Sequence, residues 1–171
     1  MRLFHYLCGV NRANTIVAFT GHRAYDGSAN GALDACITAL YAEGARTFRV
    51  GMAEGFDLAA AEAVIALMSV HADIRLEAYI PWPSFYKRFA AEDQRRYLDI
   101  VNHCSLTIYI DRSYSHTIFY QRNDRLIEGA DIVVAWWDGS SSGTGYTVKQ
   151  ARKNKLRVVN LRPDPQLLME L

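Results

Sequence analysis

The stretch ADIVVAWWDGSSSGTGYTVKQARKN, residues 130–154, passes from an apolar run through a loop of small residues into a helix-like segment. The run DIVVAWW is rich in β-branched and aromatic residues, which predicts a buried strand. The segment TVKQARKN after the loop is predicted to be a helix. The loop holds glycines at positions 139, 143 and 145, which is more than a tight reversal needs. Glycine lets a ligand lie against the backbone, so this loop is a candidate binding element.

The same succession of strand and helix runs through the rest of the chain. Further strands are predicted at TIVAFTG (15–21), RTFRVGM (46–52), IRLEAYIPW (74–82), SLTIYI (105–110) and LRVVNL (156–161). Helices are predicted over 27–45, 56–71, 84–104 (with Ser84 as the N-cap) and 117–130. This alternation predicts one α/β domain, Rossmann-like and doubly wound, with a mostly parallel sheet and helices on both faces. The domain spans residues 1–171, with a core of about 14–161 and a C-terminal extension over 162–171.

Composition narrows the class of protein. The chain has 171 residues, of which half are hydrophobic and 22% are charged, as in a globular domain with a sizeable core. Its net charge is +1, so we do not expect nucleic acid or a membrane surface as a partner. Cys8, Cys36 and Cys104 read as reduced thiols of a cytoplasmic protein. We expect no signal peptide, because the apolar N-terminal stretch is short, and no membrane span, because no apolar run approaches the roughly 20 residues that a span needs. We also expect no structural metal, because the histidines and cysteines lack metal-site spacing.

Three loops are expected at one edge of the sheet, because ligands of parallel sheets lie outside the carboxyl ends of the strands. The first is Gly21-His22-Arg23, the second runs from Gly51 to Asp57, and the third is the Ser/Gly loop. The amides that open the helix after the third loop favour a phosphate or carboxylate. Arg23 offers a bidentate anion contact, and His22 offers a hydrogen bond or a proton relay. The three loops together predict an anion-accepting pocket.

Simpler roles exist for each of these residues. Ser142 or Thr144 is a suitable cap for the helix that follows, Asp57 is a suitable cap for the second helix, and a lone histidine is often structural. Neither GxxxxGK[ST] nor GxGxxG is present, so a nucleotide would bind by another route. The aromatic and basic segment 81–97 is predicted to be a solvated helix. It is also a candidate lid, with Trp82 or Tyr86 stacking on a base, or a dimer interface.

The motifs FTGHR, GMAEGFDLAAAE, RND and DGSSSGTGYTVKQA occur in this order between about Thr15 and Asn154. In these motifs the chain resembles the YpsA-like branch of the SLOG superfamily, whose relatives are the SMF/DprA proteins and the LOG phosphoribohydrolases. Pro81, Tyr97 and Tyr114 also fall where that branch keeps a proline and tyrosines. The resemblance implies a Rossmann-like homodimer that binds a nucleotide-like ligand, such as AMP, ADP-ribose or NAD, with or without Mg²⁺.

The resemblance also implies a set of residues around that ligand. Carried over by position, they are Gly21, His22, Arg23, Gly51, Glu54, Gly55, Asp57, Glu62, Arg122, Asn123, Asp138, Gly139, Gly143, Thr144 and Thr147, to which the third loop's own sequence adds Ser142.

One departure from the relatives bears on catalysis. LOG enzymes carry PGGxGTxxE with a catalytic glutamate, and Thr147 stands at that position here. Cleaving an N-glycosidic bond usually requires such a carboxylate. The leading hypothesis is therefore a sensor or regulatory protein that binds a nucleotide, and whether it is also an enzyme is left open. One alternative is a nucleotide-processing hydrolase that uses Glu54 with His22 or Asp138. A second is a DprA-like module for single-stranded DNA, which the near-zero net charge disfavours.

Overall fold

Six strands form one sheet in the order β4-β3-β2-β1-β5-β6 in the computed structural model, which describes residues 14–162. Every neighbouring pair of strands is parallel, so the sheet is parallel throughout. The strands are β1 (Thr15–Gly21), β2 (Ala45–Val50), β3 (Arg75–Ile80), β4 (Leu106–Tyr109), β5 (Ile132–Trp136) and β6 (Arg157–Asn160). Each lies within or close to a predicted strand. Cys8 and the predicted C-terminal extension beyond Arg162 lie outside the described residues.

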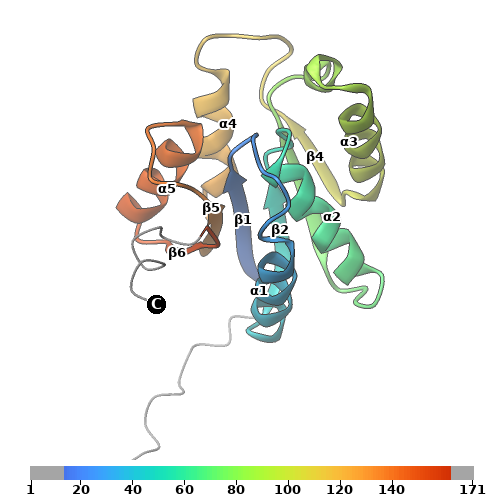
Figure 1. Ribbon diagram of the computed structural model, residues 1–171, viewed down its shortest axis with the longest axis vertical. Helices are drawn as coiled ribbons and strands as arrows, with labels where there is room; N and C mark the ends of the chain where they lie inside the picture. The colour runs from blue at the N-terminus through green and yellow to red at the C-terminus, as the bar shows by residue number, and fades with distance from the viewer. Residues whose placement is uncertain (1–13, 163–171) are drawn as a thin grey trace, which may run out of the picture.

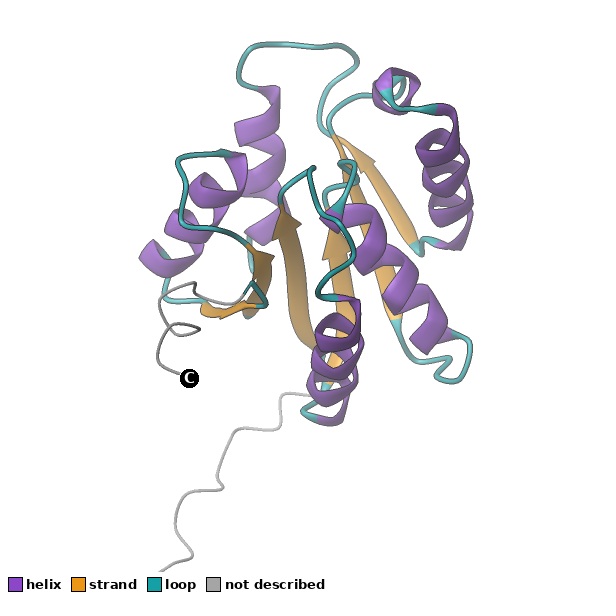
Figure 2. Ribbon diagram, viewed as in Figure 1, coloured by secondary structure: helices purple, strands orange, loops and turns teal. Residues whose placement is uncertain are grey.

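Helices cover both faces of the sheet, as predicted (Figures 1 and 2). They are α1 (Asn30–Ala42), α2 (Phe56–Met68), α3 (Ala91–His103), α4 (Ile118–Ile127) and α5 (Gly143–Lys153), with a short 3₁₀ helix η1 (Phe85–Arg88). On one side α2 packs between α1 and α3, and on the other α4 packs against α5. Within residues 14–162 no helix is both long enough and apolar enough to cross a bilayer.

The central strands carry the core. All five residues of β5 are buried, and so are Val17, Ala18 and Phe19 in β1. Because side chains alternate along a strand, Val17 and Phe19 join the larger hydrophobic cluster, whereas Ala18 joins the second cluster with residues of α4 and α5. Burial on both faces explains why these strands read as continuous apolar runs in the sequence.

The predicted helix over 84–104 is interrupted in the structure. Phe89 has an extended backbone (φ −84°, ψ 161°) between η1 and α3, and Ser84 makes no side-chain cap hydrogen bond. The break lets Phe89 turn inward, where its ring lies edge-on to Phe85 at 5.0 Å and to Tyr97 at 5.9 Å. Gln94 donates a hydrogen bond to the Phe89 carbonyl over 2.9 Å, so the interrupted backbone keeps a partner. The prediction of one continuous helix capped by Ser84 was wrong because aromatic packing outweighs local helix preference here.

The strand order reverses direction between β1 and β5. The chain leaves β1 toward α1 on one face and leaves β5 toward α5 on the other, so a crevice opens between the two loops. Helix α5 begins at Gly143, inside the Ser/Gly loop, rather than at Thr147 as predicted. The early start brings the helix N-terminus to this crevice.

Candidate ligand-binding site

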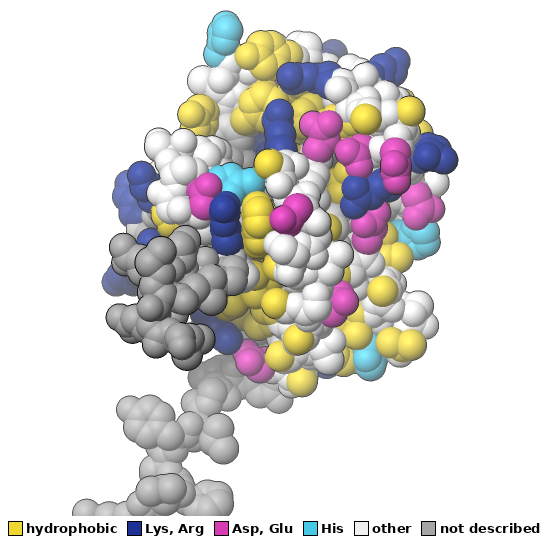
Figure 3. Space-filling view, in the orientation of Figure 1, with side chains coloured by type: hydrophobic (Ala, Val, Ile, Leu, Met, Phe, Trp, Pro, Cys, Tyr) yellow, Lys and Arg dark blue, Asp and Glu magenta, His cyan; other side chains and the backbone are white. Residues whose placement is uncertain are grey.

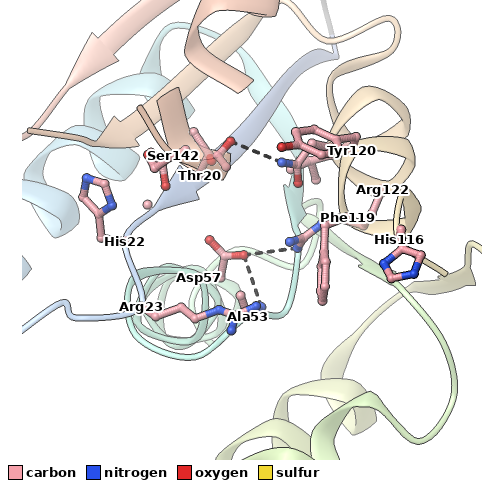
Figure 4. A pocket seen from close by; sticks show the side chains of 15 residues that line it. Thr20, His22, Arg23, Ala53, Asp57, His116, Phe119, Tyr120, Arg122 and Ser142 are labelled. Carbon is pink, nitrogen blue, oxygen red and sulfur yellow. Dashed lines mark hydrogen bonds and ion pairs between the residues drawn. The ribbon is translucent and has the colours of Figure 1, made fainter. Parts of the chain in front are cut away.

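A cavity of about 480 Å³ lies at the carboxyl edge of the sheet, between the end of β1, helix α4 and the start of α5. Figure 4 shows side chains from these elements surrounding the open space. The cavity is lined by Thr20, Gly21, His22, Arg23, Ala53, Asp57, His116, Phe119, Tyr120, Arg122, Asn123, Leu126, Ser142, Gly143 and Thr144. Cavities of this size hold ligands as large as a nucleotide.

The loop that ends at Asp57 holds the Gly21-His22-Arg23 loop in position. Gly55 has φ +78°, and a Cβ atom at this position would lie 2.3 Å from the Arg23 carbonyl oxygen. The amide of Phe56 donates a hydrogen bond to the His22 carbonyl over 3.3 Å. Only glycine combines that backbone conformation with so close an approach. Gly55 therefore holds His22 and Arg23 in place without itself lining the cavity.

A buried ion pair forms one wall of the cavity. Arg122 Nη1 lies 3.4 Å from Asp57 Oδ2 and also donates a hydrogen bond to the Gly51 carbonyl. The Ala53 amide donates to the same Asp57 oxygen over 3.2 Å. A Cβ atom on Gly51 would lie 1.8 Å from Arg122 Nη1, so only glycine admits the guanidinium here. Gly51 thus acts by making room for Arg122.

Burial governs the ionisation of this pair. It raises the pKa of Asp57 and lowers the pKa of Arg122, and in each case the charge of the partner opposes the effect. Within the described chain, Asp57 Oδ1 and Arg122 Nε have no hydrogen-bond partner. Each charge is therefore compensated chiefly by the other, and the charge of Arg23 also acts to lower the pKa of Asp57.

The N-terminus of α5 offers free donors to the cavity. Ser142 caps the helix, because its hydroxyl accepts a hydrogen bond from the Gly145 amide over 3.1 Å. The amides of Gly143 and Thr144 have no acceptor among residues 14–162. A capping role and an anion-binding role are thus compatible in this loop.

Arg23 adds a positive charge to the same cavity. It forms no ion pair with any residue in 14–162, and its guanidinium carbon lies 5.6 Å from the centre of the Phe119 ring. Nearby, His22 Nε2 lies 2.9 Å from Asp138 Oδ1. Hydrogen bonds from Ser140, and then His22, hold the pKa of Asp138 well below its ordinary value.

The structure brings together most of the predicted site residues. Those that line the cavity are Gly21, His22, Arg23, Asp57, Arg122, Asn123, Ser142, Gly143 and Thr144. Asp138 lines a neighbouring cavity, and Gly139 lines neither. Thr147 is fully buried behind the cavity, where its hydroxyl donates to the Gly143 carbonyl over 3.0 Å. Its position explains why it contributes to the helix rather than to the lining.

The two predicted glutamates lie elsewhere. Glu62 binds Arg96 of α3 through both carboxylate oxygens, at 2.7 and 2.8 Å, and does not line the cavity. Glu54 is not among the lining residues either, and no hydrogen bond joins it to His22. His22 instead contacts Asp138. The acid–base role of Glu54 stays a prediction.

Sequence reasoning missed most of the wall that α4 and the loop before it provide. His116, Phe119, Tyr120 and Leu126 line the cavity, as do Thr20 and Ala53 from other elements. A usable signal existed, because Phe119 and Tyr120 stand three residues before Arg122 and Asn123, a spacing that places them on one face of a helix. By contrast Trp82 packs edge-on against Phe85 and Phe119 and, like Tyr86, does not line the cavity.

Residues 14–162 hold no group of three or more His, Cys, Asp or Glu side chains arranged to bind a metal ion. The expectation of no structural metal, and the question of whether Mg²⁺ accompanies a bound phosphate, stay predictions.

Comparison with known proteins places the chain in a family. A family model named YpsA, and described as the YspA SLOG family, matches residues 17–161. No sequence among curated proteins matches the chain.

Two solved structures share the fold. The X-ray structure of DNA processing protein A (DprA) from Streptococcus pneumoniae superposes with a TM-score of 0.65 and 20% identity, over 85% of this chain and 49% of that one. DprA from Helicobacter pylori superposes with a TM-score of 0.65 and 18% identity, over 86% of this chain and 65% of that one. The chain thus spans between about half and two thirds of these proteins. At such identities the likeness establishes the fold.

The comparison corrects one expectation. The Helicobacter pylori structure concerns the single-stranded DNA binding mode of DprA. Our expectation that nucleic acid is an unlikely partner, which rested on the net charge of +1, was therefore wrong. Net charge sums the whole chain, whereas phosphate contacts require only a local group of Lys and Arg side chains.

Proposed function

This chain belongs to the YpsA SLOG family, and we propose that it is a sensor or regulatory protein that binds a phosphate-bearing nucleotide. One observation carries the proposal. Within residues 14–162, the guanidinium of Arg23 has no ion-pair partner and the amides of Gly143 and Thr144 have no acceptor, and all three residues border the same cavity of about 480 Å³. Charged and dipolar donors without acceptors form an anion site, and phosphate is the anion that such helix N-termini commonly bind.

The remaining lining suits the rest of a nucleotide. Phe119 and the half-exposed Tyr120 provide aromatic surface on the wall formed by α4. Asn123, whose side-chain amide donates to the Gly143 carbonyl over 3.3 Å, lies between that wall and the helix N-terminus. We therefore propose that the phosphate lies at the α5 N-terminus and Arg23, and that the base lies on the α4 side.

Binding is favoured over hydrolysis. Asp57 is the one carboxylate among the residues that line the cavity, and Arg122 and the Ala53 amide already engage it. Thr147 is fully buried, so the position of the LOG glutamate does not face the ligand. If Glu54 and His22 nevertheless form a catalytic pair, Glu54→Gln should abolish turnover of nucleotides while the fold is kept. Release of base or phosphate from a nucleotide panel measures this.

Calorimetric titration with AMP and ADP tests the binding proposal. Arg23→Ala should weaken binding by about tenfold or more, the worth of one hydrogen bond to a charged group. Gly143→Val should block the cavity and keep the fold, because an added Cβ would meet only Asn123 Nδ2 at 3.9 Å. The matched controls are Arg112→Ala, at an exposed arginine outside the lining, and Gly31→Val, where an added Cβ meets nothing within 4 Å.

Binding of neither AMP nor ADP, or wild-type affinity in both Arg23→Ala and Gly143→Val, would contradict the proposal. Thermal melting of each variant shows whether a loss of binding reflects a loss of fold.

A second candidate function is binding of single-stranded nucleic acid across the mouth of the same cavity. A series of cation–aromatic and aromatic contacts runs outward from Arg23 and Phe119, which line the cavity, through the exposed Tyr114 and the buried Trp82 to Arg88. Figure 3 shows hydrophobic side chains gathered with Lys and Arg side chains at the top of the view, over η1 and the β4–α4 loop. Aromatic platforms combined with cations are the means by which proteins hold single strands.

A labelled oligothymidylate tests this candidate. Binding should weaken as salt rises from 50 to 200 mM, by roughly tenfold or more where several phosphates are contacted. Arg88→Ala and Tyr114→Ala should weaken it further, and their affinity for AMP should not change. An oligonucleotide that fails to bind at low salt excludes the candidate. The homodimer and the cytoplasmic location remain predictions, and light scattering of the purified chain tests the first.

A further inference from the structure

Tyr146 is the fourth residue of α5, the helix whose start borders the cavity. Gly143 and Thr144 line the cavity, whereas Tyr146 does not. Its side chain lines a groove of about 560 Å³ between α4 and α5 instead. Tyr146 therefore stands beside the candidate binding site without facing the ligand.

Two contacts hold Tyr146 against α4. Its hydroxyl donates a hydrogen bond to Asp124 Oδ1 over 2.8 Å. Its ring lies edge-on to the Tyr120 ring, with the ring centres 4.8 Å apart and the planes at 72°. Tyr120 and Asp124 are four residues apart on α4 and so share one face of that helix. The hydrogen bond to Asp124 raises the pKa of Tyr146, so the hydroxyl stays protonated and keeps this contact at neutral pH.

The ring of Tyr120 is not fixed by burial. It lines the cavity on the α4 side (Figure 4), and half of the residue is exposed. Within residues 14–162 the Tyr120 hydroxyl has no hydrogen-bond partner, and Tyr146 provides its one aromatic contact. An exposed side chain populates several rotamers, and fixing one of them costs conformational entropy when a ligand binds. The contact with Tyr146 favours one orientation of Tyr120 before the ligand arrives.

We propose that Tyr146 is a positioning residue, which holds the Tyr120 ring as the surface on which the base of the ligand stacks. Tyr146 acts through Tyr120 and does not touch the ligand. Because it belongs to the helix proposed to bind the phosphate, it also fixes the base subsite relative to the phosphate subsite. This inference rests on the proposed function and adds to it the means by which the base is recognised.

Two ligands that differ in the base, AMP and ribose 5-phosphate, test the inference by calorimetric titration of the full chain. Tyr146→Leu should lower the ratio of their affinities by about two- to tenfold, the worth of one aromatic pair. Affinity for ribose 5-phosphate should not change, because the Gly143 and Thr144 amides stay in place. Tyr146→Phe keeps the ring and should retain most of the ratio. The matched control is Tyr109→Leu, at an exposed tyrosine that lines neither the cavity nor the groove.

A double variant separates positioning of Tyr120 from general support of the helices. In Tyr120→Leu, adding Tyr146→Leu should leave AMP affinity unchanged, because the ring that Tyr146 positions is gone. AMP affinity alone decides this comparison, so it holds even where ribose 5-phosphate binds too weakly to measure. Tyr146→Met replaces Tyr146→Leu if the latter folds poorly, because methionine adapts to the same space without an aromatic ring.

Three results would overturn the inference alone. They are an unchanged ratio in Tyr146→Leu, an equal fall in the affinities for AMP and ribose 5-phosphate, and a loss in the double variant that equals the sum of the single losses. If only ADP binds the wild-type chain, the double variant is titrated with ADP. If neither AMP nor ADP binds, the proposed function itself fails.

Discussion

The Asp57–Arg122 pair provides the sharpest test of how this site is built. Both side chains are almost fully buried, with 6% and 8% of their surfaces exposed. At the observed 3.4 Å, their attraction amounts to about 5 kcal/mol for an effective dielectric constant near 20. Removing one partner leaves an uncompensated charge, which typically costs about 3–5 kcal/mol. We therefore expect Asp57→Asn and Arg122→Met each to destabilise the protein severely.

The double variant should recover much of that loss. Asp57→Asn combined with Arg122→Met leaves no buried charge, and replacing a buried ion pair by neutral groups is often close to neutral in stability. For a chain of this size, 1 kcal/mol corresponds to about 2–4 °C in melting temperature, so each single variant should melt roughly 10 °C lower. Urea denaturation of the four proteins gives the coupling energy directly. A coupling below about 1 kcal/mol would refute the electrostatic account.

The pair also predicts a pH dependence whose sign can be stated. Burial already raises the pKa of Asp57, and removing Arg122 raises it further because the opposing charge is lost. A carboxyl group with a raised pKa destabilises the folded state when it ionises. Stability is therefore lost as pH rises through the folded-state pKa. Arg122→Met should gain stability, relative to the double variant, as pH is lowered from 7 toward the ordinary carboxyl range near 4. A constant difference between the two variants would contradict this.

Two further substitutions test the surroundings of the pair and the core. Gly51→Ala would place a Cβ atom 1.8 Å from Arg122 Nη1, so it should lower the free energy of unfolding by at least about 1–3 kcal/mol in urea denaturation. The control is Gly31→Ala on α1, where the added Cβ atom meets open space and stability should stay the same or rise. Burial raises the pKa of Cys104 to about 12, so a disulfide reagent at pH 8 should label this thiol far more slowly in the folded than in the unfolded chain. Since that pKa is raised from 9.0, the contribution of Cys104 to stability should fall as pH rises from 9.0 toward 12, and rapid labelling of the native protein would contradict its burial.

The layout of the sheet was predictable because its strands are buried on both faces. The β-branched and apolar runs that became β1 and β5 have no polar alternation, and burial on two faces accounts for that pattern. The interrupted segment before α3 was not predictable in the same way. Its break depends on where Phe85 and Phe89 pack among other aromatic rings, and that is decided by tertiary contacts rather than by local spacing.

The candidate site, like the fold, was predictable only in part. Residues in the loops that directly follow strands were identified, because the carboxyl ends of parallel strands meet at one edge whatever the details of packing. The orientation of a side chain within a loop is not fixed by sequence spacing, so Glu54 was expected to face a cavity that it does not line. The aromatic wall of α4 was missed although the spacing of Phe119 and Tyr120 from Arg122 and Asn123 pointed to it, because the strand order that carries α4 over the cavity was not predicted.

The candidate binding site is marked by donor groups that border one cavity and not by a sequence motif. In sequence, the Ser/Gly loop is equally suited to a helix cap, and Ser142 does cap α5. Arg23 is likewise compatible with a surface ion pair. What favours the binding role is the placement of these groups: the Gly143 and Thr144 amides, which have no acceptor in the described chain as is usual at a helix start, border the same cavity as Arg23, which forms no ion pair within residues 14–162. Water satisfies such amides in a purely structural loop, whereas beside a cavity they and the helix dipole favour an anion, and Arg23 adds positive charge to the same cavity.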